Sequence, residues 1–241
     1  VVSLMGVMAW QSIWYGAAAI AILGIPVLVW LLTQERTPQS MSAASDTLGM
    51  QGRHWTRSQC LRHRLFWFMA PALLGPSAFN TAFFFQQVYF AEIKGWDHVD
   101  LVALFPFFTL TAIGSMLLSG WALDKWGTAR LLPWSQLPMV AAFLVFSGAG
   151  SPLAALVGLF FMGLNTGANT TLVAAFWAEF YGTRHIGAIK SAAAAIMVLG
   201  SAIGPAITGG LIDLGIGLET QYVGIAGYFV LTTVLMFIGI T

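Results

Sequence analysis

Seven long apolar runs constrain this chain more than any other feature, because a helix of about 20 apolar residues spans the hydrocarbon core of a membrane. The runs are Trp10–Leu32, Leu65–Ala91, Asp100–Leu123, Leu131–Gly148, Pro152–Ala178, Ile186–Leu214 and Gln221–Thr241. Only 8% of the residues are charged and 58% are hydrophobic, and a soluble fold of this composition would expose large apolar patches. We therefore predict an all-α integral membrane protein.

Basic residues are distributed unevenly between the connections of these runs. If each run crosses the membrane once, the connections alternate between the two sides of the membrane. One side then receives only Lys94. The other side receives Arg36, Arg53, Arg57, Arg62, Arg64, Lys125, Arg130, Arg184 and Lys190. Basic residues collect on the cytoplasmic side of membrane proteins. We therefore expect the first run to enter from outside and the long connection Thr33–Arg64 to be cytoplasmic.

The connection Thr33–Arg64 is the one stretch with the composition of a linker, since it is rich in polar residues and lacks a helical apolar stripe. It separates residues 1–32 from the six runs within residues 65–241. The chain has no initial Met, and no polar tail follows its last run. We therefore expect a segment of a longer protein, in which Val1–Ala9 is the tip of a preceding helix.

Short patterns recur in the sequence about 90 residues apart. Ala112–Gly114 recurs as Ala202–Gly204, and Asn80–Thr81 recurs as Asn169–Thr170. This offset equals three runs, so the two copies would have opposite orientations in the membrane, as in the inverted repeats of many secondary transporters. Chance recurrence is the alternative, because Ala, Ile and Gly are abundant in this chain.

Polar side chains near the middle of the second and fifth runs are candidates for a substrate cavity. The candidates are the amide and hydroxyl side chains of Asn80, Gln86, Gln87, Asn165, Asn169 and Thr170. Asn165 and Asn169 are four residues apart and share one helix face. Hydrogen bonding between helices is the alternative role for such residues.

No acidic or basic residue lies near the centre of any run, where its insertion would be costly. Lys190, near an inner end, either extends to the membrane surface or reaches an anionic substrate. We find no cluster typical of a catalytic or metal site, so we expect no catalytic residues, no metal, no cofactor and no enzyme activity. The net charge of +1 gives no reason to expect a nucleic-acid partner.

The sixth run contains small residues at helical spacing, together with a proline: Gly200, Gly204, Pro205 and Gly209. Small residues allow helices to pack closely in lipid, and a neighbouring helix tolerates the bend at a proline. Close packing explains this pattern, and a hinge is a further hypothesis.

Two predicted cytoplasmic connections carry charged motifs. Gly120–Arg130, with Asp124, Lys125 and Arg130, resembles the G-x-x-x-D-R/K-x-G-R/K-R/K loop of the major facilitator superfamily, although Thr128 and Ala129 replace two basic positions. Glu179–Gly187, with Glu179 and Arg184, resembles the E-x-x-x-x-R-x-x-G arrangement of the same family. The resemblance implies that these five charged residues form a cytoplasmic gate; a solvated turn that follows the positive-inside rule is the alternative for the Gly120–Arg130 motif.

The resemblance covers nearly the whole chain and implies the second half of such a transporter. Residues 65–241 would form a six-helix bundle built as an inverted repeat of three plus three helices, residues 33–64 the central cytoplasmic loop, and residues 1–32 the end of the preceding half. The implied activity is secondary transport of a small solute, such as an organic anion, by alternating access. The implied partners are the substrate, the lipid bilayer and the missing N-terminal half.

Two short stretches, Tyr89–Trp96 and Phe180–Gly187, look similar to bacterial porters related to the monocarboxylate group. This resemblance implies a bacterial inner membrane. Export of drugs or other hydrophobic compounds by a member of the same superfamily is an alternative function. A seven-helix receptor is a second alternative, but the last run, Gln221–Thr241, lacks the lysine that a retinal protein needs.

Overall fold

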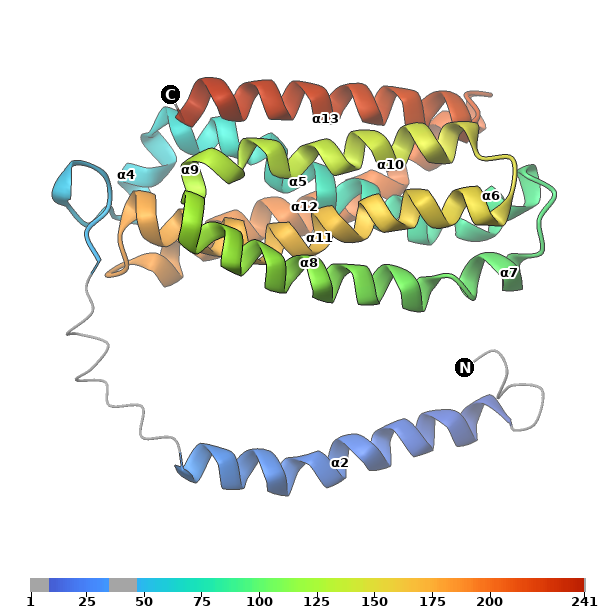
Figure 1. Ribbon diagram of the computed structural model, residues 1–241, viewed down its shortest axis with the longest axis horizontal. Coiled ribbons are helices and arrows are strands. Elements are labelled where there is room, and N and C mark those ends of the chain that lie inside the picture. The colour runs from blue at the N-terminus through green and yellow to red at the C-terminus, as the bar shows by residue number, and fades with distance from the viewer. Residues whose placement is uncertain (1–8, 35–46, 241) are drawn as a thin grey trace. The chain divides into compact units, whose positions relative to one another are not determined.

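The computed structural model describes residues 9–34 and 47–240, and this part of the chain consists of helices and their connections. The chain divides into two compact units, residues 1–46 and 47–241, which are described separately. In the first unit, α2 spans Trp10–Gln34 and contains Pro26 (Figure 1). Arg36 and nearly all of the predicted helix tip Val1–Ala9 lie outside the described residues.

The second unit begins with two short helices, η1 (Met50–Gly52) and α4 (Arg57–Arg62), and continues with six long spans. These spans are α5 (Arg64–Phe85) with α6 (Gln87–Ile93); α7 (His98–Val102) with α8 (Phe105–Trp126); α9 (Thr128–Leu131), η2 (Pro133–Gln136) and α10 (Leu137–Gly148); α11 (Pro152–Tyr181); α12 (Ile186–Asp213); and α13 (Leu218–Ile240). Counted with α2, seven spans in the described ranges are long and apolar enough to cross a membrane. The predicted all-α membrane fold is confirmed.

Three of the six spans in the second unit are interrupted. Gln86, with φ −97° and ψ 11°, separates α5 from α6. Pro106 and Pro138 stand in the first turns of α8 and α10, where the missing amide donor has no helical partner to lose. Gly127 turns the chain between α8 and α9 with φ 74°, a conformation that glycine adopts without strain.

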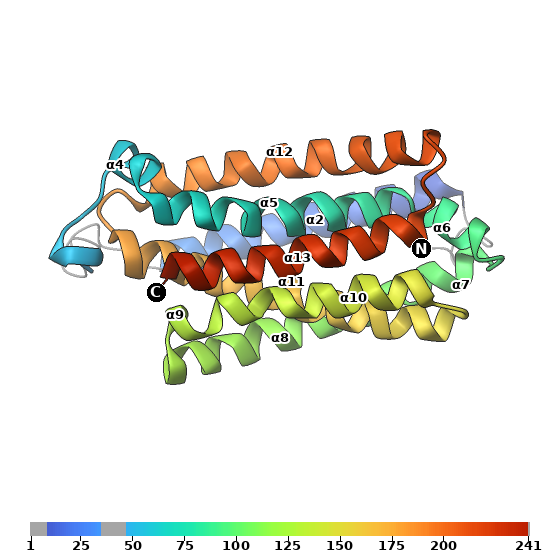
Figure 2. The ribbon, with the colours of Figure 1, turned by 90° about the horizontal axis from the view of Figure 1, so that it is seen from above.

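The contacts among the six spans remain the same when the first three spans are exchanged with the last three, as an inverted repeat predicts. The largest interfaces join α8 to α11 and α5 to α12; α10 also contacts α11, α13 contacts α5, and α10 and α13 contact each other (Figures 1 and 2). Exchanging α5 with α11, α8 with α12 and α10 with α13 reproduces this set of contacts. The packing therefore follows the order that two oppositely oriented copies of three helices predict.

Glycines allow close approach in both of the large interfaces. A Cβ added at Gly163 of α11 would lie 2.8 Å from the carbonyl oxygen of Phe108 in α8, and one added at Gly200 of α12 would lie 2.7 Å from the carbonyl oxygen of Leu74 in α5. One turn further, Gly204 approaches the backbone of Ala78 still more closely. Such contacts match the small-residue seams by which helices associate in lipid.

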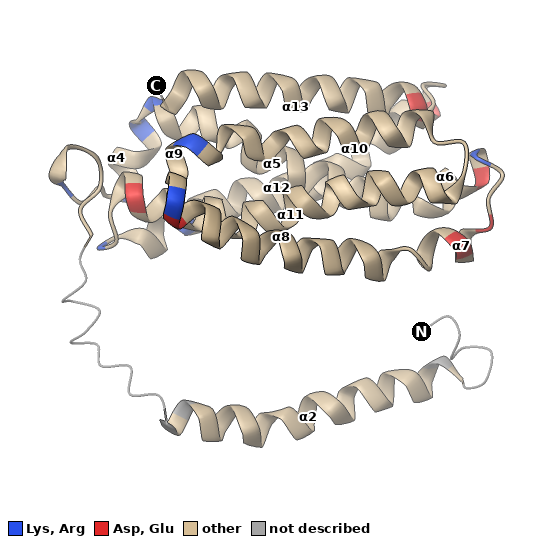
Figure 3. Ribbon diagram, viewed as in Figure 1, with Lys and Arg blue, Asp and Glu red and all other residues tan. Residues whose placement is uncertain are grey.

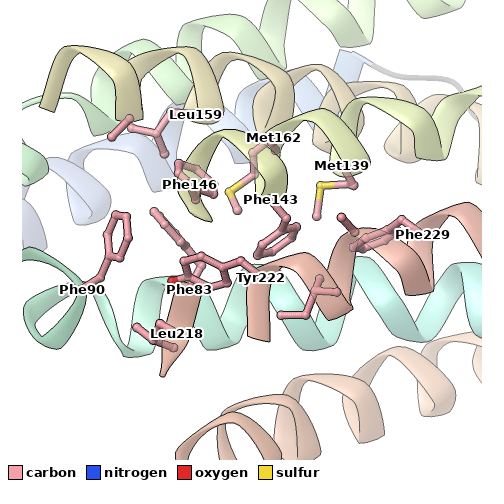
Figure 4. Packing of buried hydrophobic residues seen from close by; sticks show 14 of the residues in the cluster. Phe83, Phe90, Met139, Phe143, Phe146, Leu159, Met162, Leu218, Tyr222 and Phe229 are labelled. Atoms are coloured by element: carbon pink, nitrogen blue, oxygen red, sulfur yellow. The ribbon is translucent and has the colours of Figure 1, made fainter. Parts of the chain in front are cut away.

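An aromatic cluster forms much of the core between α5, α10 and α13 (Figure 4). Phe83 stacks on Phe146 with ring centroids 4.4 Å apart, and Phe143 stacks on Phe229 with centroids 6.0 Å apart. Tyr222 packs against this group with its ring centroid 5.4 Å from that of Phe143. Offset and edge-on aromatic contacts of this kind add to the stabilisation from burial.

Residues 47–63, which we call the docked segment, fold against the end of α11. The amide of Trp55 donates to the carbonyl of Tyr181 at 3.0 Å, and the amide of Thr183 donates to the carbonyl of Thr47 at 3.1 Å. Thr56 and Gln59 form a capping box at the start of α4. Residues 47–63 of the predicted connection Thr33–Arg64 therefore fold onto the end of α11.

Charged residues gather at the two ends of the second unit (Figure 3). The end that includes α4 and α9, which we call the basic end, carries Arg53, Arg57, Arg62, Arg64, Lys125, Arg130 and Arg184. At the opposite end, Lys94 forms an ion pair with Glu219 and donates to the carbonyl of Ser147 at 3.1 Å. The uneven distribution predicted from the sequence is present in the fold of this unit.

Candidate functional site

A cavity of about 420 Å³ lies between α5, α11 and α12. It is lined by small, apolar and polar side chains and by one lysine: Ala72, Leu73, Pro76, Ser77, Asn80, Thr81, Thr166, Asn169, Thr170, Val173, Ala174, Trp177, Lys190, Ala193, Ala194 and Met197. Its volume lies within the range of small-molecule sites, which are mostly apolar with a few placed polar groups.

Both copies of the recurring Asn–Thr pattern line this cavity. Asn80 and Thr81 come from α5, and Asn169 and Thr170 come from α11. The amide nitrogen of Asn80 donates to the hydroxyl of Thr166 at 3.3 Å and so joins the two helices across the cavity. The structure thus brings together three of the predicted binding residues, Asn80, Asn169 and Thr170.

Asn169 is held in place by two other amide side chains. The amide nitrogen of Gln136 in η2 donates to the Oδ1 of Asn169 at 3.2 Å. The Nδ2 of Asn169 donates to the Oδ1 of Asn165 at 3.1 Å. Asn165 is fully buried and donates to the carbonyl of Ser135 at 2.7 Å. Asn165 therefore lies behind the cavity and positions Asn169, whereas it was expected to line the cavity itself.

Gln86 and Gln87 also lie outside the cavity. They follow the end of α5, where the chain has already passed the polar residues at Asn80 and Thr81. The buried amide of Gln86 donates to the hydroxyl of Thr208 at 2.8 Å, and Gln221 of α13 donates to the carbonyl of Thr208 at 3.2 Å. Gln86 therefore links helices, which is the alternative role considered for such residues.

Lys190 is the one charged residue among the described residues that line the cavity. It lies near the start of α12, toward the basic end, and its side chain is exposed. No described carboxylate lies within ion-pair distance of it. The lysine therefore places an unneutralised positive charge at one edge of the cavity.

The docked segment adjoins this part of α11. Trp177 lines the cavity, and Tyr181, one turn further, contacts Trp55 with ring centroids 5.6 Å apart. Burial raises the pKa of Cys60 in this contact to about 11, against the opposing effect of its hydrogen bond with Tyr181. Burial lowers the pKa of His63, and the positive charges of Arg64 and Arg53 lower it further.

The five predicted gate residues lie at the basic end: Asp124 and Lys125 at the end of α8, Arg130 in α9, Glu179 near the end of α11, and Arg184 in the connection to α12. All five are exposed. Lys125 lies over the rings of Trp121 and Trp126, with its Nζ 5.4 Å and 5.2 Å from the ring centroids. None of the five forms an ion pair with another described residue, so their charges are not joined in this conformation.

The small residues of α12 have different surroundings. Gly200 and Gly204 approach α5 closely, whereas the nearest atom to a Cβ at Gly209 would be 4.0 Å away, on Gln86. Pro205 lies inside a helix that continues to Asp213. Close packing thus accounts for Gly200 and Gly204.

Sequence reasoning missed Gln136, which is almost completely buried and holds Asn169. Its position at the end of the short helix η2 gave no sign of this role, because its contact is formed with a residue 33 positions away. The docked residue Trp55 was missed for the same reason, since its partner Tyr181 belongs to a distant helix.

The fold is that of a multi-pass membrane protein, with apolar helical spans and charges gathered at the ends of the second unit. The sequence profile of the Major Facilitator Superfamily matches residues 1–205 and 107–241. The chain belongs to the Major Facilitator Superfamily, whose members are secondary transporters and not enzymes. A comparison with curated proteins gave no match.

Proposed function

We propose that this chain forms the C-terminal half of a secondary transporter that moves a small organic anion by alternating access. The observation that carries the proposal is the cavity between α5, α11 and α12, because it combines amide and hydroxyl groups with the single charge of Lys190. In this proposal residues 1–32 end the N-terminal half, residues 33–64 form the central loop, and residues 65–241 form the C-terminal bundle. The substrate site is completed by the N-terminal half.

Transport by the full-length protein in proteoliposomes tests this proposal. A thermal-shift screen against carboxylates, sugars and hydrophobic cations selects the solute, and uptake of the best stabiliser is then measured. Asn169→Ala removes a cavity amide and should lower uptake about tenfold at limiting substrate concentration. Ser201→Ala, in which the lost hydroxyl bonds only within α12, should leave uptake unchanged. Equal uptake by both variants would contradict the assignment of the cavity.

Export of hydrophobic compounds is the second candidate function. The observation that favours it is the apolar part of the cavity lining, which includes Leu73, Val173, Trp177 and Met197. Stabilisation by hydrophobic cations but not by carboxylates in the same screen would select this function. The resemblance of Tyr89–Trp96 to monocarboxylate porters favours the organic anion and a bacterial inner membrane.

We also propose that Asp124, Lys125, Arg130, Glu179 and Arg184 pair with one another in another conformation of the transport cycle. Their exposed positions at one end of the bundle support this role. An exposed ion pair contributes only about 0–1 kcal/mol, so such pairs would bias a conformational equilibrium without fixing it. Asp124→Arg and Arg184→Asp should each reduce uptake, and the double variant should restore it. A double variant as impaired as the single ones would exclude a direct pair between Asp124 and Arg184.

A further inference from the structure

The cavity lining changes in character along the helices. Lys190 and Trp177 line the part of the cavity near the basic end. Asn80, Asn169 and Thr170 line the part that is further from the basic end. Apolar side chains line the part between these groups: Leu73, Pro76, Val173, Ala174, Ala193 and Ala194. A ligand that fills the cavity therefore meets a cation, an apolar wall and a group of neutral polar side chains in that order.

The polar part of the cavity offers acceptors and few free donors. The hydroxyl of Thr81 donates to the carbonyl of Ser77 at 2.7 Å, and that of Thr170 donates to the carbonyl of Gly167 at 2.6 Å. Thr166 likewise donates within its own helix, at 2.9 Å. The Oδ1 of Asn80 is buried and has no partner among the described residues. A neutral hydrogen-bond donor on the ligand would satisfy this oxygen.

The length of the ligand follows from the positions of lining residues on one helix. Trp177, at the charged end of the cavity, and Thr170, at its polar end, both belong to α11 and both line the cavity. Seven residues of an α-helix rise about 10 Å. The charged and the polar ends of the cavity are thus separated by roughly the length of an eight-carbon chain.

We infer that the substrate is an elongated amphipathic anion with its anionic head at Lys190 and a hydroxyl or similar donor at its far end, near Asn80. This inference rests on the proposed function and names the substrate class of the same cavity. Lys190 supplies the charge-assisted contact, the apolar wall takes the chain, and Asn80 accepts the distal donor. Lys190 is then the residue that selects anions over neutral solutes.

Binding of 8-hydroxyoctanoate to the full-length protein tests the inference, with its methyl ester and octanoate as analogues that lack the charge and the distal donor. Titration calorimetry should give the tightest binding for 8-hydroxyoctanoate and about tenfold weaker binding for each analogue. Lys190→Gln should weaken binding of the acid about tenfold or more and leave the ester unaffected. Lys190→Arg keeps the charge and should keep most of the affinity.

Arg57→Gln is the matched control, because it removes an exposed basic residue from the same end of the bundle and does not line the cavity. Unchanged affinity in Arg57→Gln supports a specific role for Lys190. Equal binding of the acid and the ester, unaltered affinity in Lys190→Gln, or no binding of any of the three compounds would overturn the inference. If Asn169→Ala abolishes uptake while Lys190→Gln has none of these effects, the inference fails and the proposed function stands.

Discussion

Asn80 and Asn169 line the same cavity but are held differently, and the difference bears on how each meets a ligand. Asn169 has partners on both sides of its amide, from Gln136 and Asn165. Among the described residues, Asn80 forms one side-chain hydrogen bond, to Thr166, and its buried Oδ1 has no partner. Asn169 is therefore pre-organised, whereas Asn80 has unused hydrogen-bonding capacity.

Close packing at single glycines gives a prediction at the same scale. A Cβ at Gly204 meets the backbone of Ala78, which cannot move aside as a flexible side chain does. Gly204→Ala should lower the stability of the bundle by about 1–3 kcal/mol through overpacking. Gly210→Ala is the control in the same helix, because a Cβ there meets no atom within 4 Å.

Thermal unfolding of both variants in detergent micelles measures this difference. The Gly210→Ala variant should be as stable as the parent or slightly more stable, since alanine favours helix over glycine. Equal stability of the two variants would mean that α5 and α12 separate enough to accept the extra methyl group.

The sequence predicted part of the cavity, and the reason lies in helix geometry. The recurrence of Asn80–Thr81 at Asn169–Thr170 indicated two equivalent positions, and all four residues line the cavity. The direction in which Asn165 points depends on the neighbouring η2 segment, because its bond is to Ser135. No periodicity in one helix specifies which neighbour covers it.

At the scale of elements, the docked segment lies outside the membrane spans and packs against the ends of two of them. Trp55 is 4% exposed, and its ring contacts His63 with centroids 4.8 Å apart as well as Tyr181. The docked segment therefore joins the start of α5 to the end of α11. Movement of either helix end must carry the segment with it or break these contacts.

Trp55→Ala should release the docked segment, and Cys60 reports the release. Cys60 is 1% exposed and is the single cysteine of this chain. Removal of a buried tryptophan costs about 3 kcal/mol or more, which shifts an equilibrium well over tenfold. The rate at which a maleimide labels Cys60, relative to the unfolded protein, should rise at least tenfold. Leu48→Ala, which alters an exposed residue of the same segment, should leave the rate unchanged.

The same contact should respond to pH through His63. Burial and the neighbouring Arg64 and Arg53 lower the pKa of His63 in the docked state below its ordinary value of 6.5. The released state therefore binds a proton more readily, and docking, at full strength above pH 6.5, weakens as the pH falls below that value. Relative labelling of Cys60 should rise over this range.

His63→Phe is the control for this pH response, because it retains an aromatic ring without a titratable group. Labelling of Cys60 in that variant, normalised at each pH to the unfolded protein, should not change between about pH 5 and pH 8. A response that persists in His63→Phe would assign the effect to another group.

Element boundaries show what local sequence patterns predict. The Thr56–Gln59 spacing is a recognisable capping box, so the start of α4 is encoded locally. The pairings α8–α11 and α5–α12 join helices that are far apart in the sequence. Their glycines fit against the backbone of the partner helix, and the sequence of one run alone does not identify that partner. Span positions therefore follow from apolar length, and span partners follow from surface fit.

For the molecule as a whole, the separation of charges between the two ends of the second unit is the property from which topology follows. The basic end carries most of the lysines and arginines, whereas Lys94 at the other end is neutralised by Glu219. Positively charged connections are retained in the cytoplasm during insertion. We therefore expect α4 to face the cytoplasm and the connection around α7 to face outside.

Labelling of intact cells tests this orientation. In a Cys60→Ser background, Ser58→Cys places a thiol at an exposed position of α4, and Val99→Cys places one at an exposed position of α7. A membrane-impermeant maleimide should label Val99→Cys directly and Ser58→Cys only after permeabilisation, because one membrane span, α5 with α6, separates the two sites. Labelling of both thiols in intact cells would contradict the threading, and labelling of Ser58→Cys alone would reverse the orientation while leaving the bundle intact.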